Sequence, residues 1–107
     1  MQTLHSLPES PVTHNLFDEG TRWRVVIVDA HTVMREMLRM TLNAYSDLIV
    51  VVGEAFDGEE AVEQATRYQP DLVLMDVNLP QDSSLEATRA IKRLLPDSVI
   101  VGMSAEY

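Results

Sequence analysis

Four short apolar runs constrain the fold of this chain more than any other feature of its sequence. They cover residues 25–28, 48–52, 72–75 and 98–103, and valine, isoleucine and leucine dominate them. A strand that buries one face alternates between apolar and polar residues, whereas a run that is apolar on both faces is typical of a parallel strand between two helix layers. The sequence therefore predicts a parallel sheet that is buried on both faces.

Three amphipathic stretches separate these runs and predict helices over residues 32–45, 59–68 and 83–95. Asp57 can cap the second helix, and Pro70 prevents its continuation. The third helix begins with a capping-box pattern from Ser83 to Glu86 and ends before Pro96. Strands that alternate with helices in this way form right-handed crossovers, so the sequence predicts an α/β fold with helices on both faces of the sheet.

The expected core-facing residues of the helices recur at a spacing of about 3.6 residues. On the first helix they are Met34, Leu38, Thr41, Leu42 and Tyr45. On the third helix they are Ala87, Ile91, Leu94 and Leu95. Lys92, on the same helix, is expected to be a charge that faces solvent.

Two aspartates, Asp29 and Asp76, directly follow the first and third apolar runs. In a sheet of order 2-1-3-4 those strands are neighbours, so both carboxylates would meet at the carboxyl edge, where open α/β sheets bind their ligands. Paired carboxylates suit Mg²⁺, and an aspartate beside a dication can attack an acyl phosphate or a phospho-imidazole. Ser104, at the end of the fourth run, is placed to hydrogen-bond a phosphoryl oxygen. The alternative for either aspartate is a structural role as the N-cap of the next helix.

Composition limits the function classes that this chain can serve. Its 107 residues allow one small domain, and a net charge of −9, from 17 acidic and 8 basic residues, argues against a nucleic-acid surface. The absence of cysteine excludes disulfides and thiolate metal sites, and the histidines, His5, His14 and His31, show no metal-ligand spacing. The first residues do not resemble a secretory signal, and no apolar run reaches about 20 residues, so we expect a cytoplasmic protein without a membrane contact. Residues 1–22 are expected to form a flexible arm before a domain over residues 23–107.

Several motifs together resemble the receiver domain of bacterial response regulators, closest to the NarL/FixJ type. The matching segments are Val25-Val26-Ile27-Val28-Asp29, Val51-Val52-Gly53-Glu54-Ala55, Asp57-Gly58-Glu59-Glu60-Ala61, Pro70-Asp71-Leu72-Val73-Leu74-Met75-Asp76, Leu79-Pro80 and Leu85-Glu86-Ala87-Thr88-Arg89. The resemblance covers about three quarters of the chain. It implies a flavodoxin-like, doubly wound parallel sheet of order 2-1-3-4 and a function in phosphorelay signal transduction.

The resemblance assigns a role to four residues. Asp76 matches the phosphoacceptor that takes a phosphoryl group from a histidine kinase. Asp29 matches the first acid of the pair that holds Mg²⁺, and Asn78 matches the residue whose backbone carbonyl ligates the metal, so Asp29, Asp76 and Asn78 are the implied metal site. Ser104 matches the serine or threonine that contacts the phosphoryl group and couples it to a distant surface.

Two departures from the family pattern weaken these assignments. The second acid of the pair, a direct metal ligand in the family, is Ala30 here, so we expect weak Mg²⁺ binding and impaired phosphorylation. The chain also ends at Tyr107, where the family continues with a fourth helix, a fifth strand and a fifth helix. The fifth strand would carry the lysine that pairs with the phosphoryl group. We therefore expect a C-terminally truncated, degenerate receiver.

Apolar residues outside the expected core predict contacts with other proteins. Met37 and Met40 lie off the core stripe of the first helix, and Val99, Ile100 and Val101 form an expected open edge strand. These residues are the candidates for a homodimer interface. The alternative for the two methionines is that they fill the core or are tolerated in solvent.

Several hypotheses about function remain. The first is an atypical receiver, not an enzyme, that acts through homodimerisation and through contacts with a histidine kinase or another signalling protein. The second is a working phosphoacceptor that is modified on Asp76. A hydrolase with Asp76 as nucleophile is disfavoured, because aspartate-based phosphatases carry a second acid two residues later, where this chain has Asn78. DNA binding is disfavoured because no helix-turn-helix segment or basic recognition helix follows the receiver segment.

Overall fold

The computed structural model describes residues 21–104. The predicted arm over residues 1–22 lies outside the described residues except for its last two, as do residues 105–107. The four apolar runs form strands β1 (Trp23–Val28), β2 (Ile49–Ala55), β3 (Leu72–Asp76) and β4 (Val99–Met103). They pair in parallel in the order β2-β1-β3-β4. This confirms the predicted doubly wound α/β sheet, with the first and third strands as neighbours.

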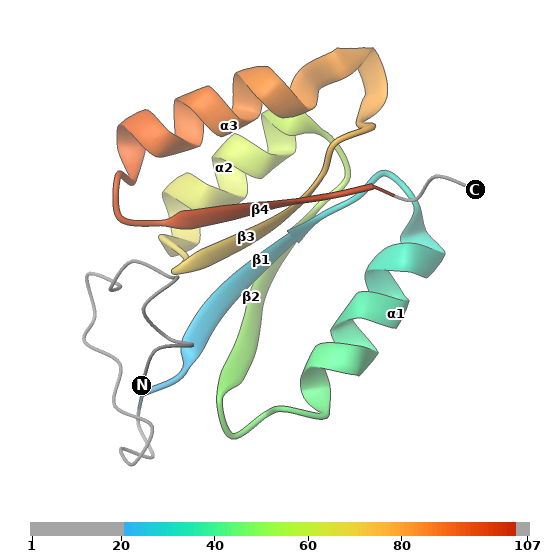
Figure 1. Ribbon diagram of the computed structural model, residues 1–107, viewed down its shortest axis with the longest axis vertical. Helices are drawn as coiled ribbons and strands as arrows, with labels where there is room; N and C mark the ends of the chain where they lie inside the picture. The colour runs from blue at the N-terminus through green and yellow to red at the C-terminus, as the bar shows by residue number, and fades with distance from the viewer. Residues whose placement is uncertain (1–20, 105–107) are drawn as a thin grey trace.

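Three α-helices connect the strands, α1 (Thr32–Asn43), α2 (Gly58–Tyr68) and α3 (Ser83–Leu94), and a short 3-10 helix, η2 (Pro80–Asp82), precedes α3. The helices α2 and α3 lie side by side on one face of the sheet, and α1 lies on the other face (Figure 1). Asp57 caps α2 as predicted, because its Oδ1 accepts a hydrogen bond from the backbone N–H of Glu60 at 2.8 Å. Within the described part of the chain, the helices are too short or too polar to cross a membrane.

The hydrophobic core lies between the sheet and the layer formed by α2 and α3. Alternate residues of a strand point to opposite faces, so every second residue of β1 and β3 enters this core. The strand residues that do so are at most 1% exposed, and they are Val26, Val28, Val73 and Met75. The helices contribute Ala61, Ala65, Ala87 and Ile91. The alanines are small, which allows both helices to pack closely on the strands.

The apolar stripes of two helices are narrower than the spacing predicts. Tyr45 and Leu94, both expected to face the core, are 56% and 54% exposed. Tyr45 lies beyond the end of α1 at Asn43, and Leu94 is the last residue of α3, so neither is covered by a neighbouring element. Thr41 is also exposed on α1. The prediction is therefore wrong for Thr41, Tyr45 and Leu94, which lie at or beyond the C-terminal ends of these helices.

The capping box predicted at the start of α3 is also wrong. The N-cap is Asp82, which makes no side-chain capping bond. Ser83 Oγ instead accepts a hydrogen bond from the backbone N–H of Gly58 at 3.0 Å, and Ser84 Oγ donates to the Val77 carbonyl at 3.0 Å. Both hydroxyls therefore bond to segments outside α3, and the order of residues at the start of the helix does not predict such partners. Ser83 thereby joins the first turns of α2 and α3.

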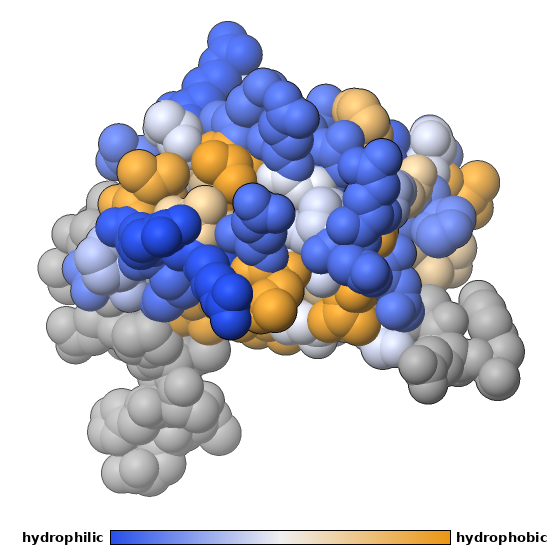
Figure 2. All heavy atoms as spheres, turned by 90° about the horizontal axis from the view of Figure 1, so that it is seen from above, coloured by the Kyte–Doolittle hydropathy of each residue, from blue (hydrophilic) through white to orange (hydrophobic). Residues whose placement is uncertain are grey.

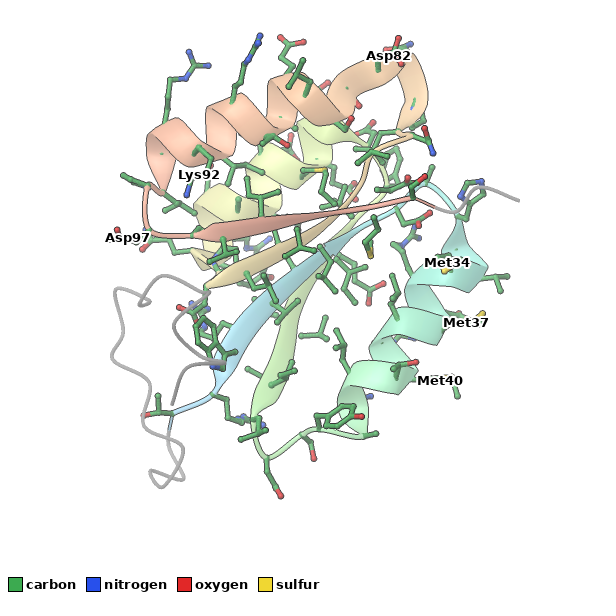
Figure 3. The ribbon with its side chains drawn as sticks, viewed as in Figure 1. Met34, Met37, Met40, Asp82, Lys92 and Asp97 are labelled. Carbon is green, nitrogen blue, oxygen red and sulfur yellow. The ribbon has the colours of Figure 1, made fainter. Side chains whose placement is uncertain are left out.

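Lys92 has a structural role that the sequence does not predict. Its Nζ donates hydrogen bonds to the carbonyls of Pro96 and Ser98 at 2.7 and 2.6 Å, so it closes the turn between α3 and β4 (Figure 3). The outer surface of the layer formed by α2 and α3 is mostly hydrophilic, with small separate apolar patches (Figure 2).

Candidate functional site

The two aspartates that follow the first and third strands meet at the carboxyl edge of the sheet. Asp29 follows β1 and Asp76 ends β3, and these strands pair directly. The two residues are only 5% and 6% exposed. Asp29 Oδ1 accepts a hydrogen bond from the backbone N–H of His31, and Asp76 Oδ1 accepts one from that of Asn78, both at 2.8 Å. Neither aspartate is a helix N-cap, since α1 begins after His31 and α3 begins after Asp82.

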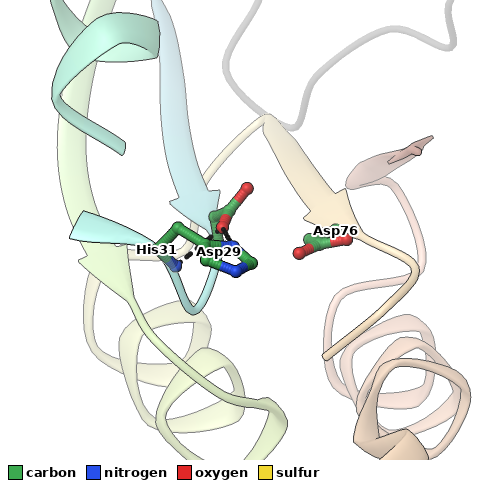
Figure 4. Close-up of side chains that lie close together, drawn as sticks. All are labelled: Asp29, His31 and Asp76. Atoms are coloured by element: carbon green, nitrogen blue, oxygen red, sulfur yellow. Dashed lines mark hydrogen bonds and ion pairs between the residues drawn. The ribbon is translucent and has the colours of Figure 1, made fainter. Parts of the chain in front are cut away.

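A histidine that its spacing in the sequence does not single out joins the two aspartates. His31 Nδ1 lies 2.9 Å from Asp29 Oδ1. One ligand atom from each of Asp29, His31 and Asp76 lies within 4.8 Å of the other two (Figure 4). The spacing of the histidines along the chain does not single out His31, which the structure places in the loop before α1 with its ring beside Asp29. The order Asp29-Ala30-His31 is the sequence signal that could have identified His31. An aspartate side chain readily accepts a hydrogen bond from the backbone N–H two residues later, and the turn that this bond forms brings His31 close to Asp29.

No lysine or arginine of the described residues pairs with the two carboxylates of the cluster. Arg35 comes close, but it donates to the backbone carbonyl of Asp29 at 2.7 Å and lies 3.5 Å from Glu54 Oε1. Ala30 adds only a methyl group. The edge is therefore rich in negative charge, which favours a bound cation.

Asn78 and Ser104 lie at the same edge and are both exposed. Asn78 reaches Asp76 through its backbone N–H. The register between β3 and β4 pairs Asp76 with Met103, so Ser104 comes directly after this pair. No side-chain hydrogen bond joins Ser104 to Asp76 in the described part of the chain.

Some of the residues predicted to form a homodimer interface are exposed, and the others are partly or largely buried. Met37 and Met40 are 57% and 70% exposed and point away from the sheet (Figure 3). On β4, Val101 is 40% exposed, whereas Val99 is partly buried and Ile100 packs against the core. The outer edge of β4 has no strand partner within residues 21–104. Ile100 is therefore committed to the core, and the exposed candidates are the two methionines and Val101.

The donor set at the carboxyl edge departs from what Mg²⁺ prefers. This ion takes oxygen ligands in octahedral geometry at about 2.0–2.1 Å. The position that matches a directly ligating acid is Ala30, and the group beside Asp29 is an imidazole nitrogen. Asp29, Asp76 and His31 form a mixed oxygen and nitrogen set, which is better suited to other dications than to Mg²⁺.

Comparison with known proteins identifies the family. Residues 25–107 match the model described as response regulator receiver domain. The chain is 38% identical over 81 residues to the transcriptional regulatory protein DegU of Brevibacillus brevis and 42% identical over 81 residues to the response regulator GacA of Pseudomonas viridiflava. Both matches cover 76% of this chain but only 34% of DegU and 37% of GacA. The chain thus spans about a third of the length of these two curated relatives.

Solved structures agree with this assignment. The chain superimposes on a two-component response regulator of the LuxR family from Aurantimonas sp. SI85-9A1 with a TM-score of 0.74 and 31% identity, covering 81% of this chain and 61% of that chain. The response regulator domain of Thermotoga maritima CheB gives a TM-score of 0.71 at 33% identity, covering 78% and 61%. The chain belongs to the response regulator receiver family of two-component signalling, as its motifs predict.

Proposed function

We propose that this receiver is atypical: Mg²⁺-dependent phosphorylation of Asp76 is impaired, and the protein acts mainly through contacts with other proteins. The observation that carries the proposal is Ala30, which stands where the family pattern has a carboxylate that ligates the metal. Two opposite unit charges about 4 Å apart attract by about 4 kcal/mol at an effective dielectric constant near 20. The loss of one carboxylate therefore weakens a dication site severely.

The surroundings of Asp76 support the proposed role as phosphoacceptor. Its Oδ1 is held by the backbone N–H of Asn78, and its Oδ2 has no protein partner within residues 21–104. Attack by this oxygen on a phosphohistidine forms a P–O bond while the P–N bond breaks and its electron pair passes to the imidazole that leaves. The charge on the phosphoryl oxygens would then face Asp29, with no lysine or arginine paired to either aspartate among the described residues. The defect that we propose lies in this surrounding charge.

The test compares the wild-type chain with the variant Ala30→Asp. Both are incubated with phosphoramidate and Mg²⁺, and the intact masses are recorded over time. We expect Ala30→Asp to acquire a phosphoryl group at least about ten-fold faster, which corresponds to about 1.4 kcal/mol of transition-state stabilisation. Asp76→Asn, alone and combined with Ala30→Asp, is the control that should acquire none.

A second candidate function is a working phosphoacceptor that takes its phosphoryl group from a histidine kinase. The approach of Asp29 and Asp76 at one edge favours it. A phosphoryl adduct that forms on the wild-type chain as fast as on Ala30→Asp would establish this candidate and overturn the first.

We propose a histidine kinase or another signalling protein as the partner of this receiver and the cytoplasm as its location. The net charge of −9 supports a surface that does not bind nucleic acid, because a phosphate-binding surface needs clustered lysine and arginine.

We further propose that the outer face of α1 forms a homodimer. Val33, Met37 and Met40 are 68%, 57% and 70% exposed, and their spacing places them on one face of the helix. A twofold dimer brings the same patch of both copies together, and methionine adapts easily to such a surface. Val101 on β4 is the remaining exposed candidate.

Sizing with light scattering at micromolar concentration tests the dimer. We expect a dimeric mass for the wild-type chain and a monomeric mass for the double variant Met37→Lys, Met40→Lys. Leu85→Lys, at a residue of α3 that is 59% exposed, is the matched control and should stay dimeric. A monomeric mass for the wild-type chain would rule out this interface.

A further inference from the structure

We propose that the carboxyl edge binds a first-row transition-metal dication, such as Zn²⁺, Ni²⁺ or Co²⁺, in preference to Mg²⁺, with His31 as a direct ligand beside Asp29 and Asp76. The inference rests on the proposed loss of the magnesium site at Ala30. It goes further because it names the class of ion that this chain selects and the side chain that selects it.

First, the donor atoms at this edge, an imidazole nitrogen beside two carboxylates, favour a transition metal over Mg²⁺. Imidazole nitrogen is a good ligand for Zn²⁺, Ni²⁺, Cu²⁺ and Fe²⁺, whereas Mg²⁺ prefers a shell of oxygen atoms. At this edge the directly ligating carboxylate of the family pattern is replaced by Ala30, and the neighbouring side chain that reaches the cluster is His31. The substitution removes an oxygen donor that Mg²⁺ needs, while His31 supplies a nitrogen donor that transition metals accept.

The geometry of the cluster is the second argument. Ligand atoms of Asp29, His31 and Asp76 lie within 4.8 Å of one another, and His31 Nδ1 already lies 2.9 Å from Asp29 Oδ1. Two ligands at about 2.0–2.2 Å from the same ion are at most about 4.4 Å apart, so only small movements are needed. The His31 side chain is 76% exposed and the Asp29 side chain is 7% exposed. The imidazole can therefore rotate toward an ion that two fixed carboxylates hold.

The unused bonding capacity of the carboxylates is the third argument. Asp76 is 94% buried at 6% exposure, yet Asn78 is the partner of only one of its oxygens. Its carboxylate points toward the side chains of Asp29 and His31 (Figure 4). The second oxygens of Asp29 and Asp76 have no hydrogen-bond or ion-pair partner within residues 21–104. Both oxygens keep contact with solvent, so each is free to bind a cation, one of the two ways in which a largely buried carboxylate is stabilised.

Calorimetric titration of the full chain with Co²⁺ and, separately, with Mg²⁺ tests the proposal. We expect one Co²⁺ per chain, bound at least about ten-fold more tightly than Mg²⁺. His31→Ala should weaken Co²⁺ binding by at least about ten-fold and leave Mg²⁺ binding unchanged. Glu36→Gln removes an exposed acidic group of α1 from outside the cluster and is the control, with no expected change. Paramagnetic shifts of the His31 ring signals on addition of Co²⁺ would give a direct sign of ligation.

Three results would overturn the proposal: no binding of Co²⁺, equal affinity for Co²⁺ and Mg²⁺, or equal Co²⁺ affinity in the wild-type chain and His31→Ala. A fold check by circular dichroism accompanies each variant. The titration contains no phosphodonor, so its failure leaves the proposed phosphorylation defect standing. Conversely, rapid phosphorylation of the wild-type chain with Mg²⁺ would remove that defect without changing the measured Co²⁺ affinity.

Discussion

The two faces of the sheet hold their helices by different means. On the face covered by α2 and α3, buried alanines and Ile91 pack against alternate residues of β1 and β3. On the opposite face, α1 has no fully buried residue at all. It covers Val25 and Ile27 of β1, which are fully buried. Ion pairs also join it to β2, since Arg39 Nη1 lies 2.6 Å from Glu54 Oε2 and Arg35 Nε lies 3.5 Å from Glu54 Oε1.

This difference shows where the stability of the domain resides. Apolar burial stabilises by about 25 cal/mol per Å², whereas a partly exposed ion pair contributes about 1 kcal/mol or less. Beside α1, Val101 is 40% exposed and Leu72 and Leu74 are only partly buried, because no other described helix covers this part of the sheet. The first face therefore carries most of the folding free energy, and the second face retains apolar surface for contacts.

The largest expected effect is the loss of a core side chain on the first face. Ile91 is fully buried, so Ile91→Ala should lower the free energy of unfolding by about 2–5 kcal/mol. Met40→Ala, at a residue of α1 that is 70% exposed, should change it by less than about 0.5 kcal/mol. Urea unfolding measures both. Similar losses for the two variants would show that the faces do not differ in this way.

The contact between the first turns of α2 and α3 gives the next effect. A Cβ atom on Gly58 would lie 2.6 Å from the backbone oxygen of Ser83, so Gly58→Ala should cost about 1–3 kcal/mol. At Gly102 a Cβ atom would lie 3.0 Å from a methyl group of Val77, which can move, so Gly102→Ala should be close to neutral. Thermal unfolding followed by circular dichroism compares the two. A neutral Gly58→Ala would mean that these two helices are not tightly joined.

Variants at the N-caps of α1 and α2 should differ less in unfolding free energy. Asp57 caps α2 with its side chain, whereas His31 at the start of α1 makes no capping bond. Asp57→Ala should therefore cost about 0.5–2 kcal/mol of unfolding free energy. His31→Ala removes only an exposed contact with Asp29 and should cost less, about 0.5 kcal/mol. Chemical denaturation distinguishes them. A large loss from His31→Ala would assign that side chain a role in folding.

The smallest expected effect concerns the ion pairs of α1. Glu54→Gln removes the partner of Arg35 and Arg39 and should lower the unfolding free energy by about 1 kcal/mol or less. The loss should shrink in about 1 M NaCl, because salt screens exposed charges. Unfolding at low and high salt measures it. A loss that does not depend on salt would indicate that packing, not charge, holds α1.

Most of the fold is predictable because its signals are local. The apolar runs that became β1 and β3 and the residues that begin and end α2 act within a few residues, and the family motifs supply the strand order. The predictions are wrong or incomplete where a side chain bonds to another segment of the chain instead of its own helix. Ser83 bonds Gly58 rather than its own helix, and Lys92 bonds the turn that follows it. Neither partner can be identified from the spacing of residues along the chain.

The candidate site was predictable in part for the same reason. Asp29 and Asp76 stand at strand ends, so the strand order brings them together. His31 lies in the loop after β1, and its approach to Asp29 depends on the turn made by the aspartate side chain. Periodicity does not describe such a turn, and a rule based on histidine spacing overlooks it.

The loop that follows Asp76 contains two consecutive residues in left-handed backbone conformation, Gln81 with φ 59° and Asp82 with φ 52°. Neither is glycine, and each such residue costs about 1–2 kcal/mol relative to a right-handed conformation. A segment that carries this strain opens more easily than the sheet around it. We therefore expect the amide hydrogens of residues 79–84 to exchange with solvent well before those of β1, so that the least costly local opening of the domain occurs beside the proposed phosphoacceptor.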